Sequence, residues 1–343
     1  MAGGRLWVVG DGERARRALT RGLTAIPGIR VGHASDPDAL TGCTVILCEA
    51  GAVGGVDIRG SASETSSVDT LRAGHIAGQV HGIVLAGGSA FGLEAACGVR
   101  SYLERRGAGF QTGPAVVPIV PCAVLFDLGI GRADVRPTRE MGEQAADAAT
   151  ADPVAEGAVG AGTGATVGKI FGMRQAMKSG VGSGQVACGG GVIVAALAVV
   201  NAFGDVRDPS TGKLIAGALR DPGSLELADT EAVIQADGGL RTPFEPRNTT
   251  LVVVATNARL SKVEAAKLAQ IAGLGLARTI YPVNTAFDGD VVFALSLGSA
   301  QASVDALGVA AANAVAQAVV RAVKTAPSMG GLPGLAGTSE RNS

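Results

Sequence analysis

Aromatic side chains are scarce in this chain: phenylalanine, tyrosine and tryptophan make up 3% of its 343 residues, with a single tryptophan. A core with so few rings must be filled by small and aliphatic side chains, and the chain offers 52 glycines and 47% hydrophobic residues. This composition is typical of closely packed layers joined by tight turns, and it argues against a disordered chain. The length allows one large domain or two ordinary ones.

An excess of charge of either sign is also missing. The 29 lysines and arginines against 30 aspartates and glutamates leave a formal net charge of −1, so no basic field attracts nucleic acid. The longest apolar run, residues 192–200, falls short of the roughly 20 residues that a membrane helix needs. Residues 1–21 lack the apolar core and cleavage site of a signal peptide. We therefore expect a cytoplasmic protein with neither a nucleic-acid nor a membrane partner.

Cysteine and histidine are too few and too scattered to suggest a metal or thiol centre. The five cysteines form no C-x-x-C pair and are typical of small buried hydrophobic residues. The three histidines, His33, His75 and His81, lie early in the chain without the spacing of metal ligands. We expect no metal and no cofactor.

The most informative stretch that is present is Asn248-Thr249-Thr250, where a polar segment containing Pro246 meets an apolar run that begins at Leu251. A threonine hydroxyl is a weak nucleophile, but the α-amino group of a chain-terminal threonine can act as its base. That amine has a reference pKa of roughly 7.7–8.0, so part of it is unprotonated near neutral pH. The stretch suggests self-cleavage between Asn248 and Thr249. Strand propensity alone also explains two threonines before a valine run.

Hydrophobic patterns predict strands and helices that form layered sheets covered by helices. The apolar run 116–126 contains Pro118 and Pro121, so it predicts an edge strand or an irregular extended segment. The polar, turn-rich residues 206–247 predict an exposed excursion that ends at the proposed cleavage site. Strands are expected at residues 43–48, 82–85, 190–200, 251–255 and 287–297. Helices are expected at residues 70–79, from a turn at 87–92 to about 106, at 139–149, from Ser261 to about 274, and at 304–323.

The glycine-rich segment 157–169 resembles a phosphate-binding loop but departs from it at two positions. The pattern G-x-x-x-x-G-K-[ST] requires glycine at position 163 and a hydroxyl residue at position 170, where this chain has Thr163 and Ile170. Without that hydroxyl there is no magnesium ligand. The glycines more simply allow Lys169 and nearby backbone to crowd against an active site.

Six blocks in a fixed order give the chain a specific resemblance. The blocks are Pro27-Gly28-Ile29-Arg30-Val31-Gly32-His33, Leu85-Ala86-Gly87-Gly88-Ser89-Ala90-Phe91-Gly92-Leu93, Gly164-Ala165-Thr166-Val167-Gly168-Lys169, Asn201-Ala202-Phe203-Gly204-Asp205, Asn248-Thr249-Thr250 and Phe287-Asp288-Gly289-Asp290. Over about residues 24–325 the chain resembles the DmpA-type aminopeptidases, which include β-peptidyl aminopeptidases and nylon-oligomer (aminohexanoate-oligomer) hydrolases. The Asn-Thr-Thr junction and the paired aspartates are most similar to the nylon-oligomer branch, since other members use serine.

The resemblance implies an α/β/β/α sandwich like that of the N-terminal-nucleophile hydrolases, with different connectivity. It implies one domain, residues 25–325, that cuts itself into a large chain (25–248) and a small chain (249–325). Residues 1–24 are then an N-terminal extension and 326–343 a disordered tail. Assembly into a homo-oligomer of cleaved heterodimers is also implied.

The resemblance gives roles to further residues. Asp288 and Asp290, two positions apart on a predicted strand, would face one side and orient Thr249 or hold a substrate ammonium; otherwise they form a solvated turn. Lys169 would depress the pKa of the Thr249 amine by like-charge repulsion, or it is a surface lysine after a glycine loop. Asn201 would donate to the oxyanion, or it is a turn asparagine.

Two further residues are expected to line the substrate pocket, Ser89 and Phe126. Some relatives carry tyrosine at the position of Phe126, whose ring has no hydroxyl to contact an oxyanion, so activity could be slower or directed at other substrates. We expect Thr249 to hydrolyse a small peptide or amide, either at an N-terminal residue or in a β- or ω-amino amide. Acyl transfer, as in the self-cleaving ornithine acetyltransferases, and a homologue that never matures are the alternatives.

Overall fold

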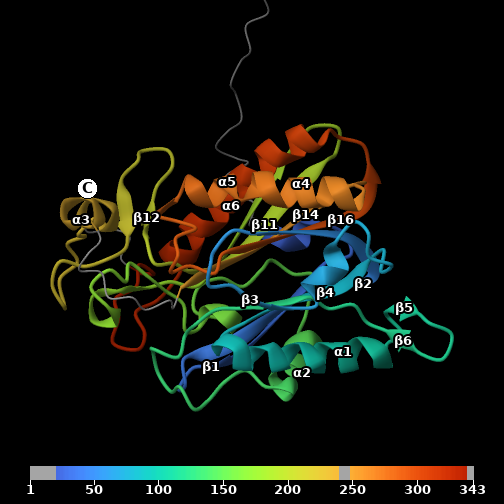
Figure 1. Ribbon diagram of the computed structural model, residues 1–343, viewed down its shortest axis with the longest axis horizontal. Helices are drawn as coiled ribbons and strands as arrows, with labels where there is room; N and C mark the ends of the chain where they lie inside the picture. The colour runs from blue at the N-terminus through green and yellow to red at the C-terminus, as the bar shows by residue number, and fades with distance from the viewer. Residues whose placement is uncertain (1–20, 239–247, 338–343) are drawn as a thin grey trace, which may run out of the picture.

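Four layers make up the computed structural model, which describes residues 21–238 and 248–337. Figure 1 shows two helices at the bottom, two layers of strands above them, and further helices on top. The lower helices are α1 (Ala95–Arg105) and α2 (Arg139–Asp147). The upper ones are α4 (Lys262–Ala272), α5 (Leu274–Ala277) and α6 (Val304–Lys324). This order confirms the predicted α/β/β/α sandwich.

One long strand, β2 (Thr41–Ile58), belongs to both strand layers. Its first half pairs with β1 and β4, its register shifts between Leu47 and Ala52, and its second half pairs antiparallel with β16. Beside β2, the first sheet contains β1 (Arg30–Asp36), β3 (Glu64–Ser66), β4 (Val80–Ala86) and β7 (Cys122–Val124). The second contains β10 (Val181–Ala187), β11 (Ile193–Asn201), β14 (Thr249–Ala258) and β16 (Val291–Ala300).

Alternating side chains fill the space on both faces of each sheet. In β11, Val194, Ala196 and Ala198 point into the core beneath α4 and α6, whereas the intervening residues point into the core between the sheets. Strand β14 divides in the same way. Because side chains alternate along a strand, a continuous apolar run of this kind indicates a strand that is covered on both faces. On the first sheet, the outward side chains pack against α1 and α2.

Local sequence signals set the ends of the upper helices. Ser261 and Glu264 form the reciprocal capping box that their spacing predicts for α4. Helix α6 begins after the N-cap Ser303 and ends in a basic turn that complements the helix dipole. Among the described residues, α6 is the one helix long and apolar enough for a membrane span, yet 67% of that window is buried. It packs on β10, β11 and α4, as expected of a core helix.

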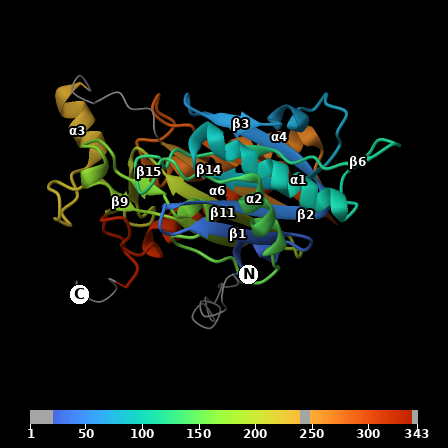
Figure 2. The same cartoon turned by 90° about the horizontal axis from the view of Figure 1, so that it is seen from below.

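Smaller elements extend the two ends of the sandwich. Figures 1 and 2 both place α3 (Thr230–Asp237) at one end and the hairpin of β5 (Phe110–Gln111) and β6 (Val116–Val117) at the other. A three-stranded sheet near α3 contains β12 (Asp205–Arg207), β13 (Leu214–Ala216) and β15 (Ile280–Tyr281). A short hairpin joins β8 (Thr166–Val167) to β9 (Met177–Lys178).

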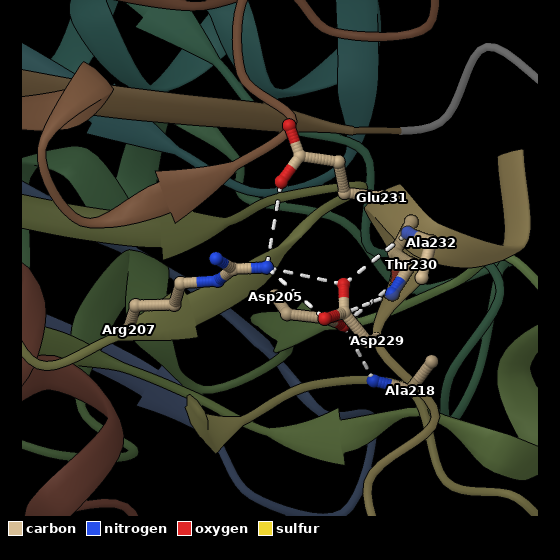
Figure 3. Close-up of polar contacts among 7 residues, drawn as sticks. All are labelled: Asp205, Arg207, Ala218, Asp229, Thr230, Glu231 and Ala232. Carbon is tan, nitrogen blue, oxygen red and sulfur yellow. Dashed lines mark hydrogen bonds and ion pairs between the residues drawn. The ribbon is translucent and has the colours of Figure 1, made fainter. Parts of the chain in front are cut away.

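A polar network fastens the start of α3 to this small sheet (Figure 3). The Arg207 guanidinium donates to both carboxylate oxygens of Asp229, each at 3.1 Å, and to Glu231 at 3.4 Å. It also lies over the Tyr281 ring. Buried Asp205 accepts the Thr230 N–H at 2.6 Å and the Ala218 N–H at 2.7 Å. The start of helix α3 is thereby held against the small sheet.

Two expectations fail in this structure. Residues 70–79, predicted as a helix, contain only the end of a 3₁₀ turn, Val68–Leu71, because glycines and a polar loop follow. Residues 326–337, predicted as part of a disordered tail, pack on the body: Leu332 is buried beside Leu40 and Ile130. Of the rest of that tail, 338–343 lies outside the described residues, as does most of the N-terminal extension.

Candidate active site

Thr249 is the first residue of β14 and is buried, with 4% of its surface exposed. Strands β11 and β14 run antiparallel, and their register places Thr249 directly opposite Asn201, the last residue of β11. A strand end and a strand start therefore meet at one edge of the second sheet. The candidate site is built around this meeting point.

The peptide bond in front of Thr249 is held by the loop that precedes β16. The carbonyl oxygen of Asn248 accepts the Gly289 N–H at 2.9 Å and the Thr249 hydroxyl at 2.5 Å. The Asn248 side-chain amide donates to the Phe287 carbonyl oxygen at 3.3 Å. A Cβ atom at Gly289 would lie 2.8 Å from the Thr249 hydroxyl oxygen and 2.6 Å from the Ala62 carbonyl oxygen. Only glycine therefore fits between the Thr249 hydroxyl and the neighbouring backbone.

Asp288 and Asp290 lie in this loop rather than on a strand, which corrects the prediction. Strand β16 begins at Val291, after both aspartates, and Asp288 forms only an isolated bridge with Asn248. Their carboxylates accept four backbone N–H groups. Asp290 accepts from Thr250 at 2.6 Å and from Asn284 at 3.0 Å, and Asp288 accepts from Phe203 at 3.1 Å and from Thr285 at 3.2 Å. The Thr285 hydroxyl also donates to Asp288 at 2.6 Å. The loop is consequently pinned to the starts and ends of the site strands.

Burial makes both carboxyl groups weaker acids. It raises the pKa of Asp290 to about 7, and the neighbouring Asp288 charge adds to the rise. Burial also raises the pKa of Asp288, against the hydrogen bonds from Thr285 and Phe203. Two like charges in one buried site cannot both ionise cheaply. Ionisation of one carboxyl group therefore opposes ionisation of the other.

Lys169 meets the site through Asn201. Its ammonium nitrogen donates to the side-chain oxygen of Asn201 at 2.8 Å and to the Asn201 main-chain oxygen at 3.1 Å. Burial lowers the pKa of Lys169 to about 7, while the charges of Asp288 and Asp290 oppose that fall. Lys169 is thus not the surface lysine that a glycine loop alone would allow. It carries a group that exchanges a proton near neutral pH.

The orientation of the Asn201 amide is fixed by its partners. Its oxygen accepts from Lys169 and from both the backbone N–H and the hydroxyl of Thr166, at 3.1 and 3.3 Å. The nitrogen must therefore be the donor end, and it donates to the Phe126 carbonyl oxygen at 3.0 Å. An amide nitrogen carries two hydrogens, so one remains for another acceptor.

Ser89 and Phe126 lie one step further from Thr249. Phe126 contacts the site through its backbone carbonyl, which accepts the Asn201 amide. Ser89 donates its backbone N–H at 3.0 Å to the carbonyl of Leu125, the residue before Phe126. Ser89 opens a 3₁₀ turn, Ser89–Glu94, instead of capping a helix with its side chain. The structure thus brings Thr249, Asn201, Lys169 and the two aspartates together, with Phe126 and Ser89 adjoining them.

Sequence reasoning missed two contributors, Thr166 and Gly289. Thr166 belongs to the same sequence block as Lys169. A hydroxyl residue within that glycine-rich block was the signal that could have identified it as a partner of Asn201. The contribution of Gly289 is a backbone N–H, which no side-chain pattern reveals.

Comparison with known proteins places this arrangement among peptidases. The model of peptidase family S58 matches residues 22–336. The chain is 41% identical over 340 residues to an uncharacterized aminopeptidase of Mycobacterium tuberculosis, covering 91% of this chain and 96% of that one. It is 30% identical to a 6-aminohexanoate-oligomer endohydrolase of a Kocuria species, covering 87% of this chain and 84% of that one.

Solved structures show the same fold. A β-aminopeptidase from a Burkholderia species superposes with a TM-score of 0.65 at 25% identity, covering 92% of this chain and 91% of that one. The L-aminopeptidase D-Ala-esterase/amidase from Ochrobactrum anthropi, described as a variant of the Ntn-hydrolase fold, gives a TM-score of 0.68 at 21% identity. That match covers 91% of this chain and 88% of the solved one.

Proposed function

The chain belongs to peptidase family S58, and from this premise we propose that it is a self-processing amide hydrolase whose nucleophile is Thr249. Membership makes it a hydrolase of the DmpA type. The proposal adds that Thr249 is internal at first, cuts the bond behind it, and then acts as the chain-terminal nucleophile.

One observation carries the proposal. The Thr249 hydroxyl lies 2.5 Å from the Asn248 carbonyl oxygen, in the peptide bond that precedes it, and the same oxygen accepts the Gly289 N–H. Attack by the hydroxyl oxygen on the Asn248 carbonyl carbon forms a C–O bond and puts negative charge on that carbonyl oxygen. A backbone donor already aimed at this oxygen stabilises the charge as it develops. Gly289 is thus the oxyanion donor of self-cleavage.

The proton of the hydroxyl passes to Lys169 in this scheme. A neutral lysine amine has two hydrogens, which the two Asn201 oxygens accept, and a lone pair that remains to take a proton. With a pKa of about 7, Lys169 is neutral in a large fraction of molecules above that pH. The proton then goes to the Thr249 nitrogen as the C–N bond breaks. Water hydrolyses the resulting ester and leaves an Asn248 carboxylate and a free Thr249 amine.

In the cleaved enzyme the new α-amine replaces Lys169 as the base. The Thr249 hydroxyl attacks a substrate carbonyl, the Asn201 amide donates its second hydrogen to the oxyanion, and the leaving amine takes the proton from the α-ammonium. Water, deprotonated by the α-amine, then hydrolyses the acyl ester on Thr249, which releases the acid and restores the hydroxyl. Below about pH 7 the charge on Lys169 lowers the pKa of the amine by repulsion. Asp288 and Asp290 hold a substrate ammonium in this scheme.

The substrate class follows from those two carboxylates. A buried acidic pair favours an amide with a free amino group a few bonds away, such as an N-terminal residue or a β- or ω-amino amide. The printed names of the relatives, aminopeptidase and 6-aminohexanoate-oligomer endohydrolase, support this class. A cytoplasmic location and a homo-oligomer of cleaved heterodimers belong to the same proposal.

The test is a gel of the purified protein with N-terminal sequencing of its fragments. The wild type is expected to give two bands, the smaller beginning at Thr249, because cleavage needs only groups of this chain. Thr249→Ala should stay whole, and Thr249→Ser, which keeps a hydroxyl, should still be cut. A wild type that stays whole, or a Thr249→Ala protein that is cut at the same bond, contradicts the proposal.

A further inference from the structure

Lys178 is a lysine whose side chain is entirely buried, with 0% of its surface exposed. It ends β9, opposite Thr166 of β8 in the short hairpin. Its ammonium donates to three backbone carbonyls, those of Ala165 and Ser179 at 2.9 Å and that of Gly162 at 3.2 Å. Removing an ammonium from water is costly unless other groups replace its solvation. Three convergent carbonyl dipoles supply part of that replacement.

A carboxylate on a neighbouring segment, Asp127, supplies the opposing charge. Burial lowers the pKa of Lys178 to about 7, and the charge of Asp127 partly offsets this fall. Asp127 is itself buried, accepts the Gly88 N–H and the Thr41 hydroxyl at 2.7 Å each, and has a pKa raised to about 6. It follows Phe126, whose carbonyl accepts the Asn201 amide. Asp127 and Lys178 therefore each adjoin a residue that bonds to Asn201: Asp127 follows Phe126, and Lys178 binds the carbonyl of Ala165, next to Thr166.

The carbonyls that Lys178 binds bracket the turn that supplies the partners of Asn201. Ala165 directly precedes Thr166, which donates twice to the Asn201 side chain, and Lys169 follows three residues later. The backbone of Ser179 also donates to the Ala165 carbonyl at 3.0 Å. A turn rich in glycine has little stiffness of its own. The ammonium of Lys178 ties its two ends together.

The C-terminal residues brace the same hairpin from outside. The Lys178 backbone N–H donates to the Pro333 carbonyl at 2.8 Å, and Met329 and Leu332 pack in the cluster that contains Ala176. Under the proposed cleavage, Pro333 belongs to the small chain and Lys178 to the large one. Both pieces thus hold this lysine in place.

We propose that Lys178 is a positioning residue for the Thr249 site: its ammonium holds the 162–166 turn so that Thr166 and Lys169 reach Asn201, and its charge acts on Lys169 from behind. The inference rests on the proposed function, since it concerns the same reaction. Lys178 touches neither the scissile peptide nor Asn201 in this scheme, and it acts through the turn.

The charge part of the proposal has a definite sign. The charged groups that act on Lys169 are Asp288, Asp290 and Asp127, which raise its pKa, and Lys178, which lowers it. At pH values where Lys178 is protonated, removing its charge leaves the attraction of the carboxylates unopposed, so the pKa of Lys169 rises. Less Lys169 is then neutral at a given pH, and the acid side of the cleavage profile moves to higher pH.

Two substitutions separate the hydrogen bonds from the charge. Lys178→Met removes both, whereas Lys178→Gln keeps an amide that can still donate to backbone carbonyls. We expect self-cleavage at pH 7.5 to slow about tenfold or more in Lys178→Met and less in Lys178→Gln, because a small misplacement of reacting groups is costly. In both variants the acid side of the profile should move up by about 0.5 pH units or more.

The chain offers a matched control in Lys262. Its ammonium also donates to three backbone carbonyls, those of Thr70, Arg72 and His75, but it follows the far end of β14. Lys262 is only partly buried, so Lys262→Met tests whether losing three carbonyl bonds away from the site slows cleavage. It should cleave at the wild-type rate with an unmoved pH profile. Time courses on denaturing gels from pH 5.5 to 9, with circular dichroism of each precursor, provide the readouts.

Each outcome bears on the proposal. Slower cleavage with a shifted profile in the Lys178 variants alone supports it. Folded Lys178 variants with the wild-type profile, or a slowing matched by Lys262→Met, overturn it, as does failure of both Lys178 variants to fold, which would make the lysine a support of the whole molecule. A wild type that stays whole counts against the proposed function, and this inference falls with it.

Discussion

Two groups of polar residues, one at the start of α3 and one around the start of β14, use their charges in opposite ways. On one side Arg207 is neutralised by Asp229 and Glu231 and stacks on an aromatic ring. On the other side Lys169 bonds to the neutral oxygens of Asn201, while Asp288 and Asp290 bond to backbone N–H groups. The first arrangement fastens α3 to a small sheet. The second contains a lysine bonded to Asn201 and an aspartate bonded to Thr250, and burial moves the pKa of each to about 7.

The comparison teaches which charges a fold sets aside for chemistry. In the first group each charge faces an opposite charge, and the ion pairs of Arg207 hold α3 in place. A buried lysine and a buried acid pair that are not neutralised in this way cost stability, and their pKa values move toward neutrality as a result. Substitutions in the two groups should therefore have opposite effects: loss of cleavage in one, and loss of stability in the other.

The largest expected effect is that of Lys169→Met. Removing the proposed proton acceptor should slow self-cleavage by about a hundredfold or more, because general base catalysis commonly contributes that much. The rate is measured from the appearance of the small chain on denaturing gels. Lys324→Met, which removes an exposed lysine near Asp208, is the control and should cleave normally. Equal rates for Lys169→Met and wild type would remove Lys169 from the mechanism.

A second effect is the dependence of cleavage on pH. Burial lowers the pKa of Lys169 to about 7, so protonation on the acid side of that value blocks its lone pair. The rate should fall about tenfold per pH unit below that point and level off above it. The Arg207→Met variant should show the same curve, since its group takes no part. A flat profile between pH 5.5 and 8.5 would argue against any base with a pKa near 7.

The smallest expected effect belongs to Asp205→Asn, since this buried carboxylate anchors α3 through backbone N–H groups rather than contacting Thr249 or Asn201. The carboxylate accepts from Ala218 N–H, Thr230 N–H and the Thr230 hydroxyl, and an amide would set one N–H against another. The free energy of unfolding should fall by about 1–3 kcal/mol. Urea unfolding in the uncut Thr249→Ala background measures it. Cleavage in the otherwise wild-type chain should stay within about threefold; its loss with unchanged stability would reverse the roles of the two groups.

Much of the fold could be predicted because its signals are local. The valine run after Thr249, the capping box at Ser261 and the alanine-rich stretch of α6 each carry their own pattern, and each forms the predicted element. The double role of β2 has no such pattern, since pairing with two sheets depends on distant partners. The glycines and prolines of residues 326–337 suggested disorder because composition does not reveal a backbone bond such as that between Lys178 and Pro333.

The candidate site was predictable only in part, for the same reason. Thr249, Lys169, Asn201 and the two aspartates are far apart along the chain, and a resemblance to a family, not their spacing, drew them together. The alternation argument for Asp288 and Asp290 failed because a loop replaces the first residues of the predicted strand. Gly289 contributes a backbone N–H, and Thr166 contributes a backbone N–H together with its hydroxyl. The acceptors of these groups are distant in the sequence, so the sequence alone does not reveal them.

Under the proposed cleavage, the position of strand β14 has a consequence for the two resulting pieces. The strand lies between β11 and β16, and α4 and α6 cover one of its faces. The segment that begins at Thr249 therefore supplies central strands of the second sheet. The nicked pieces cannot part without dismantling that sheet. Once they have parted, each lacks the strands that complete the other, and reassembly becomes a bimolecular search. The persistence of the nicked enzyme is therefore governed by how slowly it comes apart, and heat inactivation should be a one-way event.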